Sequence, residues 1–279
     1  MFYREIVSFL WERMMSEFTT SDNVKIHYED VGEGKPLVLL HGWSASGKAF
    51  CRNVPVLSKK YRVINVDLRF HGGSGKPSYG CRIERLSMDV AELINSLNLQ
   101  DVTMLGWSMG CSVIWGYWDL FRSARLSKMI LFDEAPLNLI QADNPYGFLD
   151  FEGVQKLCDY INKDHDNALA KFNTTGFTKP EFESKYLAQF VSESLKMPAK
   201  EGTLLLKHHI YLDWRDLIPT IDIPTLIMAG LVGGVVKPEA NKWNHDHIKG
   251  SKMETFNCGH FAFLEDTDHF NNAVMDFIG

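Results

Sequence analysis

"DVTMLGWSMGCSVIWGYW", residues 101–118, places one serine between two glycines, with an apolar run on each side. The run before Ser108 is typical of a buried strand, and the run after it is typical of a buried helix. A strand that turns directly into a helix strains the residue at the turn and points its side chain outward. Side chains two residues away would collide there, and Gly106 and Gly110 avoid this collision. The stretch predicts an accessible serine hydroxyl at the end of a strand.

The rest of the chain alternates short apolar runs with segments of helical period. This pattern predicts an α/β fold, with a central sheet and crossover helices on both of its faces. Most of the strands are apolar on both faces, so we expect a mostly parallel sheet, whereas residues 24–32 alternate and predict an antiparallel edge strand. The other predicted strands are 36–40, 61–67, 101–106, 128–133, 224–230 and 252–257, and the predicted helices are 83–98, 109–122, 237–248 and 262–278.

About ninety residues separate the strand that ends near Asp133 from the strand that begins near Pro224, far more than one crossover needs. Their helical period and their many Phe, Tyr and Leu residues predict an inserted helical cap over 137–212, on a core of 19–136 and 213–279. Residues 1–18 space their apolar side chains as an amphipathic helix does. Some of the cap's aromatic rings should line a pocket. These are Tyr146, Phe148, Phe151, Phe172, Phe177, Tyr186 and Phe190.

Composition argues against several classes of protein. Hydrophobic residues make up 45% of the 279 positions, and no segment approaches 18 consecutive apolar residues, so we expect no membrane span. The formal charge is −6 with acids and bases interspersed, which argues against a nucleic-acid partner. The five cysteines are odd in number and never spaced as CxxC, which predicts reduced thiols in a cytoplasmic protein. We predict neither a metal site nor a cofactor, and the oligomeric state stays open.

Three further segments accompany "GWSMG" (106–110): "HGW" (41–43), "DLRFHGGSGKP" (67–77) and "NCGHFAFLED" (257–266). In this order and spacing, residues 24–279 resemble the α/β-hydrolase fold family, particularly its small esterase-like and C–C-hydrolase-like members. The resemblance implies that Ser108 is a nucleophile and His260 its general base. It also implies that the backbone amides of Trp43 and Met109 form an oxyanion hole.

The third member of such a triad is not at its usual place. Most relatives carry an aspartate in the loop after the strand that matches 224–230, but "GLVGGVVKPE" (230–239) has Gly233 there. Some family members, including certain lipases, carry the acid one strand earlier. The strand that ends in "MILFDEAP" (129–136) offers Asp133 at this position, with Glu134 beside it as the alternative. We predict Asp133 as the acid.

These residues together predict a serine hydrolase that cleaves small to medium acyl esters through an acyl-enzyme intermediate. Its partner would be a small-molecule ester. A lactone hydrolase or a C–C bond hydrolase would use the same site. Gly233 also motivates an alternative of another class, a non-hydrolytic ligand receptor or interaction protein built on a hydrolase scaffold.

Overall fold

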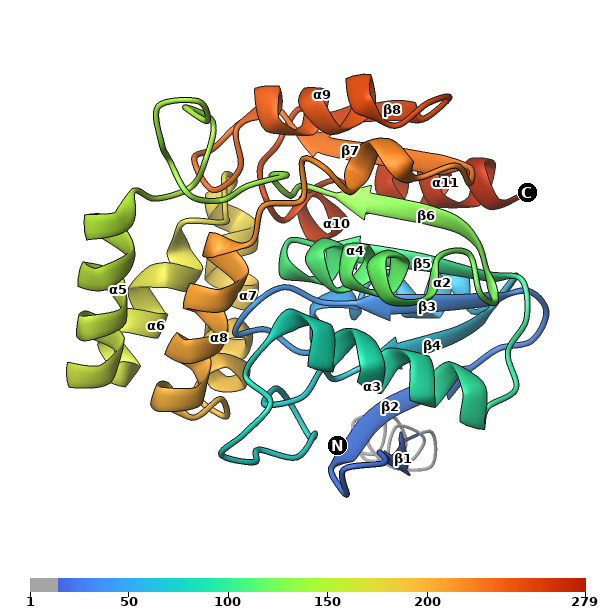
Figure 1. Cartoon of the computed structure of the whole chain (residues 1–279), viewed down its shortest axis with the longest axis horizontal. Coiled ribbons are helices and arrows are strands. Elements are labelled where there is room, and N and C mark those ends of the chain that lie inside the picture. The colour runs from blue at the N-terminus through green and yellow to red at the C-terminus, as the bar shows by residue number, and fades with distance from the viewer. Residues whose placement is uncertain (1–14) are drawn as a thin grey trace.

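The computed structural model describes residues 15–279, in which eight strands form one sheet. The strands are β1 (Met15–Thr19), β2 (Lys25–Val31), β3 (Pro36–Leu40), β4 (Arg62–Val66), β5 (Val102–Trp107), β6 (Leu126–Phe132), β7 (Thr225–Gly230) and β8 (Lys252–Phe256). Their order across the sheet is β1-β2-β4-β3-β5-β6-β7-β8 (Figure 1). Strands β3 to β8 run parallel, and β1 and β2 pair antiparallel at one side. The predicted mostly parallel sheet is confirmed.

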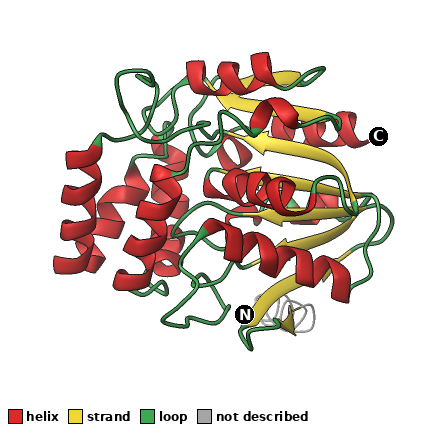
Figure 2. Cartoon of the chain, in the orientation of Figure 1, coloured by secondary structure: helices red, strands yellow, loops and turns green. Residues whose placement is uncertain are grey.

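Helices cover both faces of this sheet (Figures 1 and 2). Along β3, Val38 and Leu40 pack into the core under α3 (Ile83–Ser96) and α4 (Met109–Phe121). Leu37 and Leu39 point to the other core, under α2 (Val54–Leu57) and α11 (Thr267–Ile278). Because both faces are buried, the central strands are mostly apolar on both faces and do not alternate between apolar and polar residues. The remaining core elements are the 3-10 turns η1 (Gly47–Phe50) and η2 (Ile218–Thr220) and the helices α9 (Pro238–His247) and α10 (Ala262–Glu265).

Three details of the secondary structure differ from the prediction. The predicted helix over 1–18 falls mostly on residues 1–14, outside the described residues, and residues 15–18 belong to β1 instead. The segment 24–32 forms the antiparallel strand β2, but β1 pairs on its outer side, so β2 is not the edge. The predicted helix 262–278 is broken at Asp266, whose non-helical backbone (φ −140°, ψ 53°) separates α10 from α11.

Four helices connect β6 to β7 and gather beyond one end of the sheet (Figure 1). We call residues 137–212 the helical insertion. Its helices are α5 (Phe151–Lys163), α6 (His165–Thr174), α7 (Pro180–Ser194) and α8 (Ala199–Tyr211). Hydrogen bonds join it to the loop after β3: the Trp43 indole N–H donates to the Gly202 carbonyl at 2.9 Å, and the Ser194 hydroxyl donates to the Ser44 carbonyl at 2.7 Å.

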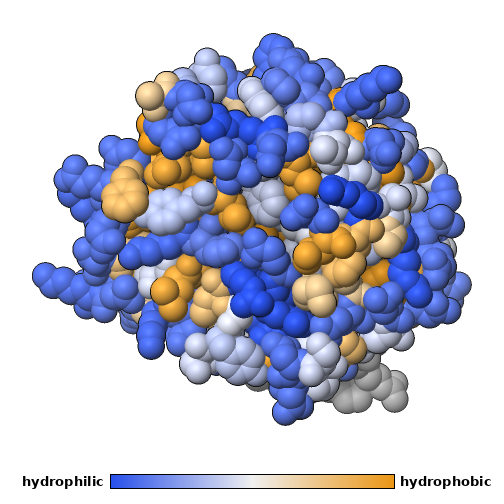
Figure 3. Space-filling view, in the orientation of Figure 1, coloured by the Kyte–Doolittle hydropathy of each residue, from blue (hydrophilic) through white to orange (hydrophobic). Residues whose placement is uncertain are grey.

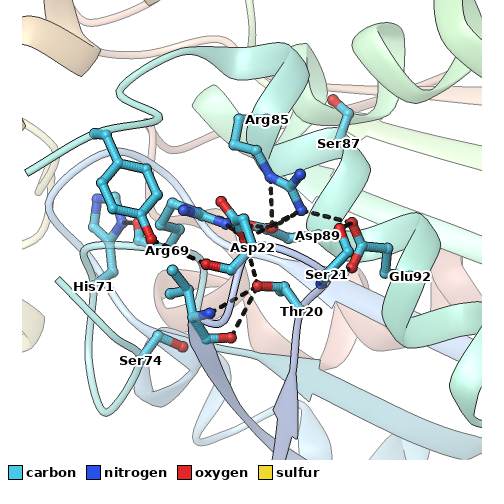
Figure 4. Close-up of polar contacts among 12 residues, drawn as sticks. Thr20, Ser21, Asp22, Arg69, His71, Ser74, Arg85, Ser87, Asp89 and Glu92 are labelled. Carbon is cyan, nitrogen blue, oxygen red and sulfur yellow. Dashed lines mark hydrogen bonds and ion pairs between the residues drawn. The ribbon is translucent and has the colours of Figure 1, made fainter. Parts of the chain in front are cut away.

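A buried ion cluster joins α3 to the loop after β4 and to the turn between β1 and β2 (Figure 4). The fully buried Arg69 guanidinium donates to both carboxylate oxygens of Asp89, at 2.7 and 2.8 Å, and to Asp22 at 2.8 Å. Arg85 donates to Asp89 at 2.6 Å and to Glu92 at 2.7 Å. The hydrogen bond from Arg69 lowers the pKa of Asp22 to about 2. Each of these charges has a partner of opposite sign, whereas an isolated buried charge would be energetically costly.

The face of the molecule in Figure 3 is hydrophilic over most of its area, with hydrophobic side chains in separate patches. Within residues 15–279, none of the helices combines the length and the apolar character that crossing a bilayer requires.

Candidate active site

Ser108 lies at the sharp turn between β5 and α4. Its backbone, with φ 54° and ψ −129°, is in a region that residues other than glycine rarely adopt. A Cβ on Gly106 would lie 2.6 Å from the Cys111 nitrogen, and one on Gly110 would lie 2.2 Å from the Leu40 carbonyl oxygen. Both glycines are therefore required by backbone contacts, as the sequence pattern predicts.

The loop after β3 lies directly against this serine. A Cβ on Gly42 would be 3.0 Å from the Ser108 Cβ and 3.4 Å from its Oγ, so any side chain at this position would crowd Ser108. The buried His41 side chain connects this loop to the segment after β4. Its Nε2 accepts from the Leu68 N–H at 3.0 Å, and its Nδ1 donates to the Gly42 carbonyl at 2.8 Å. Burial lowers the pKa of His41, which suits this neutral, structural role.

His260 and Asp133 are in direct contact. Nδ1 of His260, in the loop between β8 and α10, lies 2.7 Å from Oδ2 of Asp133, which follows β6. Their exposed fractions are 8% and 2%. A carboxylate only accepts hydrogen bonds, so in the neutral ring Nδ1 carries the proton and Nε2 keeps its lone pair. On its other side, Asp133 accepts from the Asn241 side-chain amide through Oδ1 at 2.8 Å.

The alternative acid, Glu134, faces other residues. Its Oε1 accepts from the Ala135 N–H at 3.0 Å and from the Asn138 amide at 2.5 Å. Its Oε2 lies 3.5 Å from Nε2 of His209. Gly233 lies near Thr178, whose methyl group would be 3.4 Å from an added Cβ, and it contributes nothing to the His260 contact.

One cavity is lined by Ser108 and His260 together with Trp43 and Glu134. Its volume is about 50 Å³, well below the roughly 300 to 1,000 Å³ of sites for drug-sized ligands. Of the seven insertion rings predicted as candidates, Phe148 and Phe172 line it. Phe177, Tyr186 and Phe190 are buried in the core, and Tyr146 and Phe151 are exposed.

The two amides predicted as oxyanion donors flank the serine. Trp43 follows Gly42 and lines the cavity, and Met109 is the first residue of α4. Neither backbone N–H has a hydrogen-bond acceptor elsewhere in residues 15–279. The first amides of a helix have no partner within the helix and carry its positive dipole end, which suits them to bind an anion.

The cysteines of this region are inert thiols. Cys111 and Cys258 are buried and unpaired, and burial raises the pKa of Cys258 to about 12 and that of Cys111 well above its usual range. A nucleophilic thiol needs the opposite shift. Within residues 15–279, no three His, Cys, Asp or Glu side chains lie together in a group that could hold a metal ion.

Two polar residues at this site were not predicted from the sequence. Asn241, which holds Asp133, lies in α9, more than 100 residues away along the chain, and has no motif around it. His209 belongs to the pair "HH" (208–209), which has no metal-ligand spacing, yet it lines the cavity. Helical period would have placed it beside Leu206 and Ile210, two other lining residues.

The chain matches the family model described as the alpha/beta hydrolase fold over residues 35–267. It belongs to the α/β-hydrolase family. The chain is similar to a solved esterase from Exiguobacterium antarcticum, with 30% identity, a TM-score of 0.90 and coverage of 95% of this chain and 99% of the esterase. A solved bromoperoxidase from Bacillus anthracis is 27% identical, with a TM-score of 0.90 and coverage of 94% and 99%. The AB hydrolase superfamily protein YisY of Bacillus subtilis is 29% identical over 92% of this chain and 97% of its own length.

These relatives confirm the expected fold and a family of small esterase-like hydrolases. The sheet, the turn at Ser108 and the connection that carries the helical insertion all belong to the region that they share with this α/β hydrolase.

Proposed function

We propose that this α/β hydrolase is a serine hydrolase that cleaves small to medium acyl esters through an acyl-enzyme intermediate. The observation that carries the proposal is the 2.7 Å contact between His260 Nδ1 and Asp133 Oδ2, beside a cavity that Ser108 also lines. A serine hydroxyl is a weak nucleophile until a base accepts its proton. With Nδ1–H held by the carboxylate, Nε2 of the imidazole is free to be that base.

In the proposed reaction, Ser108 Oγ attacks the ester carbonyl carbon while its proton passes to His260 Nε2. The amides of Trp43 and Met109 donate to the oxyanion of the tetrahedral intermediate. His260 then gives the proton to the leaving alkoxide, and the C–O bond breaks to leave an acyl-Ser108. Water attacks this ester with His260 again as base, which releases the acid and restores the serine.

The cavity favours short acyl groups. Its volume of about 50 Å³ and its apolar rings suit a few methylene groups. In this proposal the helical insertion is a cap, since it supplies Phe148, Phe172 and other lining residues, while the segments that follow β5, β6 and β8 supply the reacting ones. The 30% identity to a solved esterase supports the same reaction class.

Active-site labelling tests the proposal. A fluorophosphonate probe should label the wild-type protein at Ser108, and Ser108→Ala should abolish both labelling and hydrolysis of p-nitrophenyl acetate. Ser123→Ala, at an exposed position just after α4, is the matched control and should label normally. If the wild type neither labels nor hydrolyses the ester above the buffer rate, the proposal is wrong and a non-hydrolytic receptor is favoured. Hydrolysis of lactones but not of open-chain esters by a labelled protein would narrow the substrate class instead.

A further inference from the structure

A polar corner interrupts the apolar wall of the cavity. Glu134, Asn138 and His209 all line it, and they come from the segment after β6 and from α8. The exposed fraction of each is 6% or less. Around them the wall is made of apolar side chains such as Phe148 and Ile210. A buried polar cluster in such a wall is costly unless all of its groups are hydrogen-bonded.

One group of this corner has no partner. Within residues 15–279, two side chains that line the cavity carry a buried nitrogen without a hydrogen bond, Trp107 through Nε1 and His209 through Nδ1. The Trp107 indole packs among aromatic rings, with Phe261 and Phe263 at centroid distances of 5.4 and 4.8 Å. His209 instead lies among polar groups, so its unpaired nitrogen is the one that a polar ligand group can satisfy.

The contacts decide which atom of the ring carries the proton. The Asn138 side chain must turn its amide nitrogen to Glu134, because two oxygens at 2.5 Å would repel. The same nitrogen lies 3.4 Å from Nε2 of His209, and since an amide nitrogen only donates, Nε2 is the acceptor in the neutral ring. The proton is then on Nδ1. If the ring is charged beside Glu134, Nδ1 is protonated as well, so in both states it is a donor without an acceptor.

We infer that His209 Nδ1–H is a specificity-determining donor that binds a second oxygen atom of the substrate, remote from the ester that is cleaved. This inference rests on the proposed function. Glu134, whose Oε2 is 3.5 Å from the ring, makes the corner unfavourable for an anionic group. The substrate class is therefore an ester whose acyl chain carries an uncharged oxygen, a ketone or a hydroxyl, rather than a free carboxylate.

The energetic reason is that the donor is already buried and unpaired in the free protein. A substrate that supplies the acceptor satisfies the donor, whereas an apolar chain of the same shape leaves it unsatisfied. Sites built to bind a polar group reject analogues that lack it more strongly than apolar pockets reject an extra methylene. We expect a preference of at least about tenfold in kcat/KM.

Matched p-nitrophenyl esters test this inference: hexanoate, 4-oxohexanoate, 5-oxohexanoate and the monoester of adipic acid. The wild type should favour one of the oxo esters over hexanoate by about tenfold or more and should disfavour the adipate monoester. In His209→Phe, which keeps a ring of similar shape, the oxo-to-hexanoate ratio should fall to about one. His208→Phe, at the neighbouring and more exposed position, should keep the wild-type ratio.

The outcomes separate this inference from the proposed function. If the wild type hydrolyses hexanoate and both oxo esters equally, or if His209→Phe keeps the preference, the inference is wrong while the serine mechanism is unaffected. If no ester is hydrolysed and Ser108 is not labelled, the proposed function itself fails. The Tm of His209→Phe should lie within a few degrees of the wild-type Tm. A loss of the oxo-to-hexanoate preference then reports a change in the cavity and not unfolding of the variant.

Discussion

Asn241 donates a hydrogen bond from its side-chain amide to Oδ1 of Asp133 at 2.8 Å, while Oδ2 of the same carboxylate contacts His260. The two oxygens are therefore held by different neighbours, one from α9 and one from the loop after β8. The carboxylate cannot rotate without breaking one of these contacts. This fixes the position from which Asp133 can orient the imidazole.

Asp133→Asn should lower kcat by about four orders of magnitude. An amide in this place would favour the wrong tautomer of His260, as replacement of the triad acid does in other serine hydrolases. Glu134→Gln is the matched comparison, because it removes the neighbouring carboxylate, which does not touch His260. Its kcat for p-nitrophenyl acetate should fall less than tenfold. The reverse order of effects would move the acid role to Glu134.

Asn241→Ala should lower kcat by about tenfold and leave KM nearly unchanged. The substitution removes one donor from a charged acceptor, an interaction worth about 1.5–3 kcal/mol, but leaves the His260 contact in place. Asn244→Ala is the control on the same helix, since that side chain donates to the backbone carbonyl of Glu134 at 2.8 Å. Steady-state kinetics on both variants make the comparison. Equal losses of kcat in the two variants would show that the hydrogen bond to Asp133 has no specific effect and that only the intact packing of α9 affects catalysis.

Asp89→Ala should destabilise the fold by about 3–5 kcal/mol. It removes the carboxylate that binds two nitrogens of the fully buried Arg69 guanidinium and leaves only Asp22 as its partner within residues 15–279, and breaking a buried ion pair costs about that much. Asp30→Ala removes the partner of Arg62, a pair at the partly exposed side of the sheet, and should cost about 1 kcal/mol or less. Urea unfolding of both variants measures the difference. Similar losses of unfolding free energy in the two variants would mean that burial of an ion pair does not determine how much its removal destabilises the protein.

The free energy of unfolding should fall as the pH is lowered from about 4 to 2. Two aspartates have pKa values near 2 in the folded protein, below the ordinary 3.8: Asp22 and Asp67. Burial alone would raise the pKa of Asp67, but hydrogen bonds from His27 and from the Gly73 and Gly47 amides outweigh it.

A carboxylate with a lowered folded pKa stabilises the protein above its unfolded pKa, and this stability is lost as the pH falls through the folded one. Urea unfolding at pH 5, 4, 3 and 2.5 checks the slope. Asp67→Asn should make the unfolding free energy depend less steeply on pH over this range, whatever the variant's stability at pH 7. An unchanged slope in that variant would contradict the assignment.

Local patterns were enough to predict most of the core. The strands β3 to β7 consist mainly of apolar residues, and the glycines around Ser108 prevent clashes within one turn, so both signals lie within a few residues. The strand β1 was missed because "MSEFT" (15–19) lies at the sheet edge, where partly exposed residues lose the apolar pattern. Its pairing with β2, and not its own sequence, makes it a strand.

The sequence alone determined the fold class, the turn at Ser108 and the candidate position of His260, because each depends on neighbouring residues or on the order of strands. Tertiary structure decided which acid reaches the imidazole. Asp133 and Glu134 are adjacent, and Asp133 has a φ of 57°, so their side chains point to different neighbours. Only the strand order β6-β7-β8 brings His260 and Asn241 to Asp133, while Glu134 lies beside His209. Contacts between segments this far apart in the chain depend on side-chain direction in three dimensions, which no local pattern encodes.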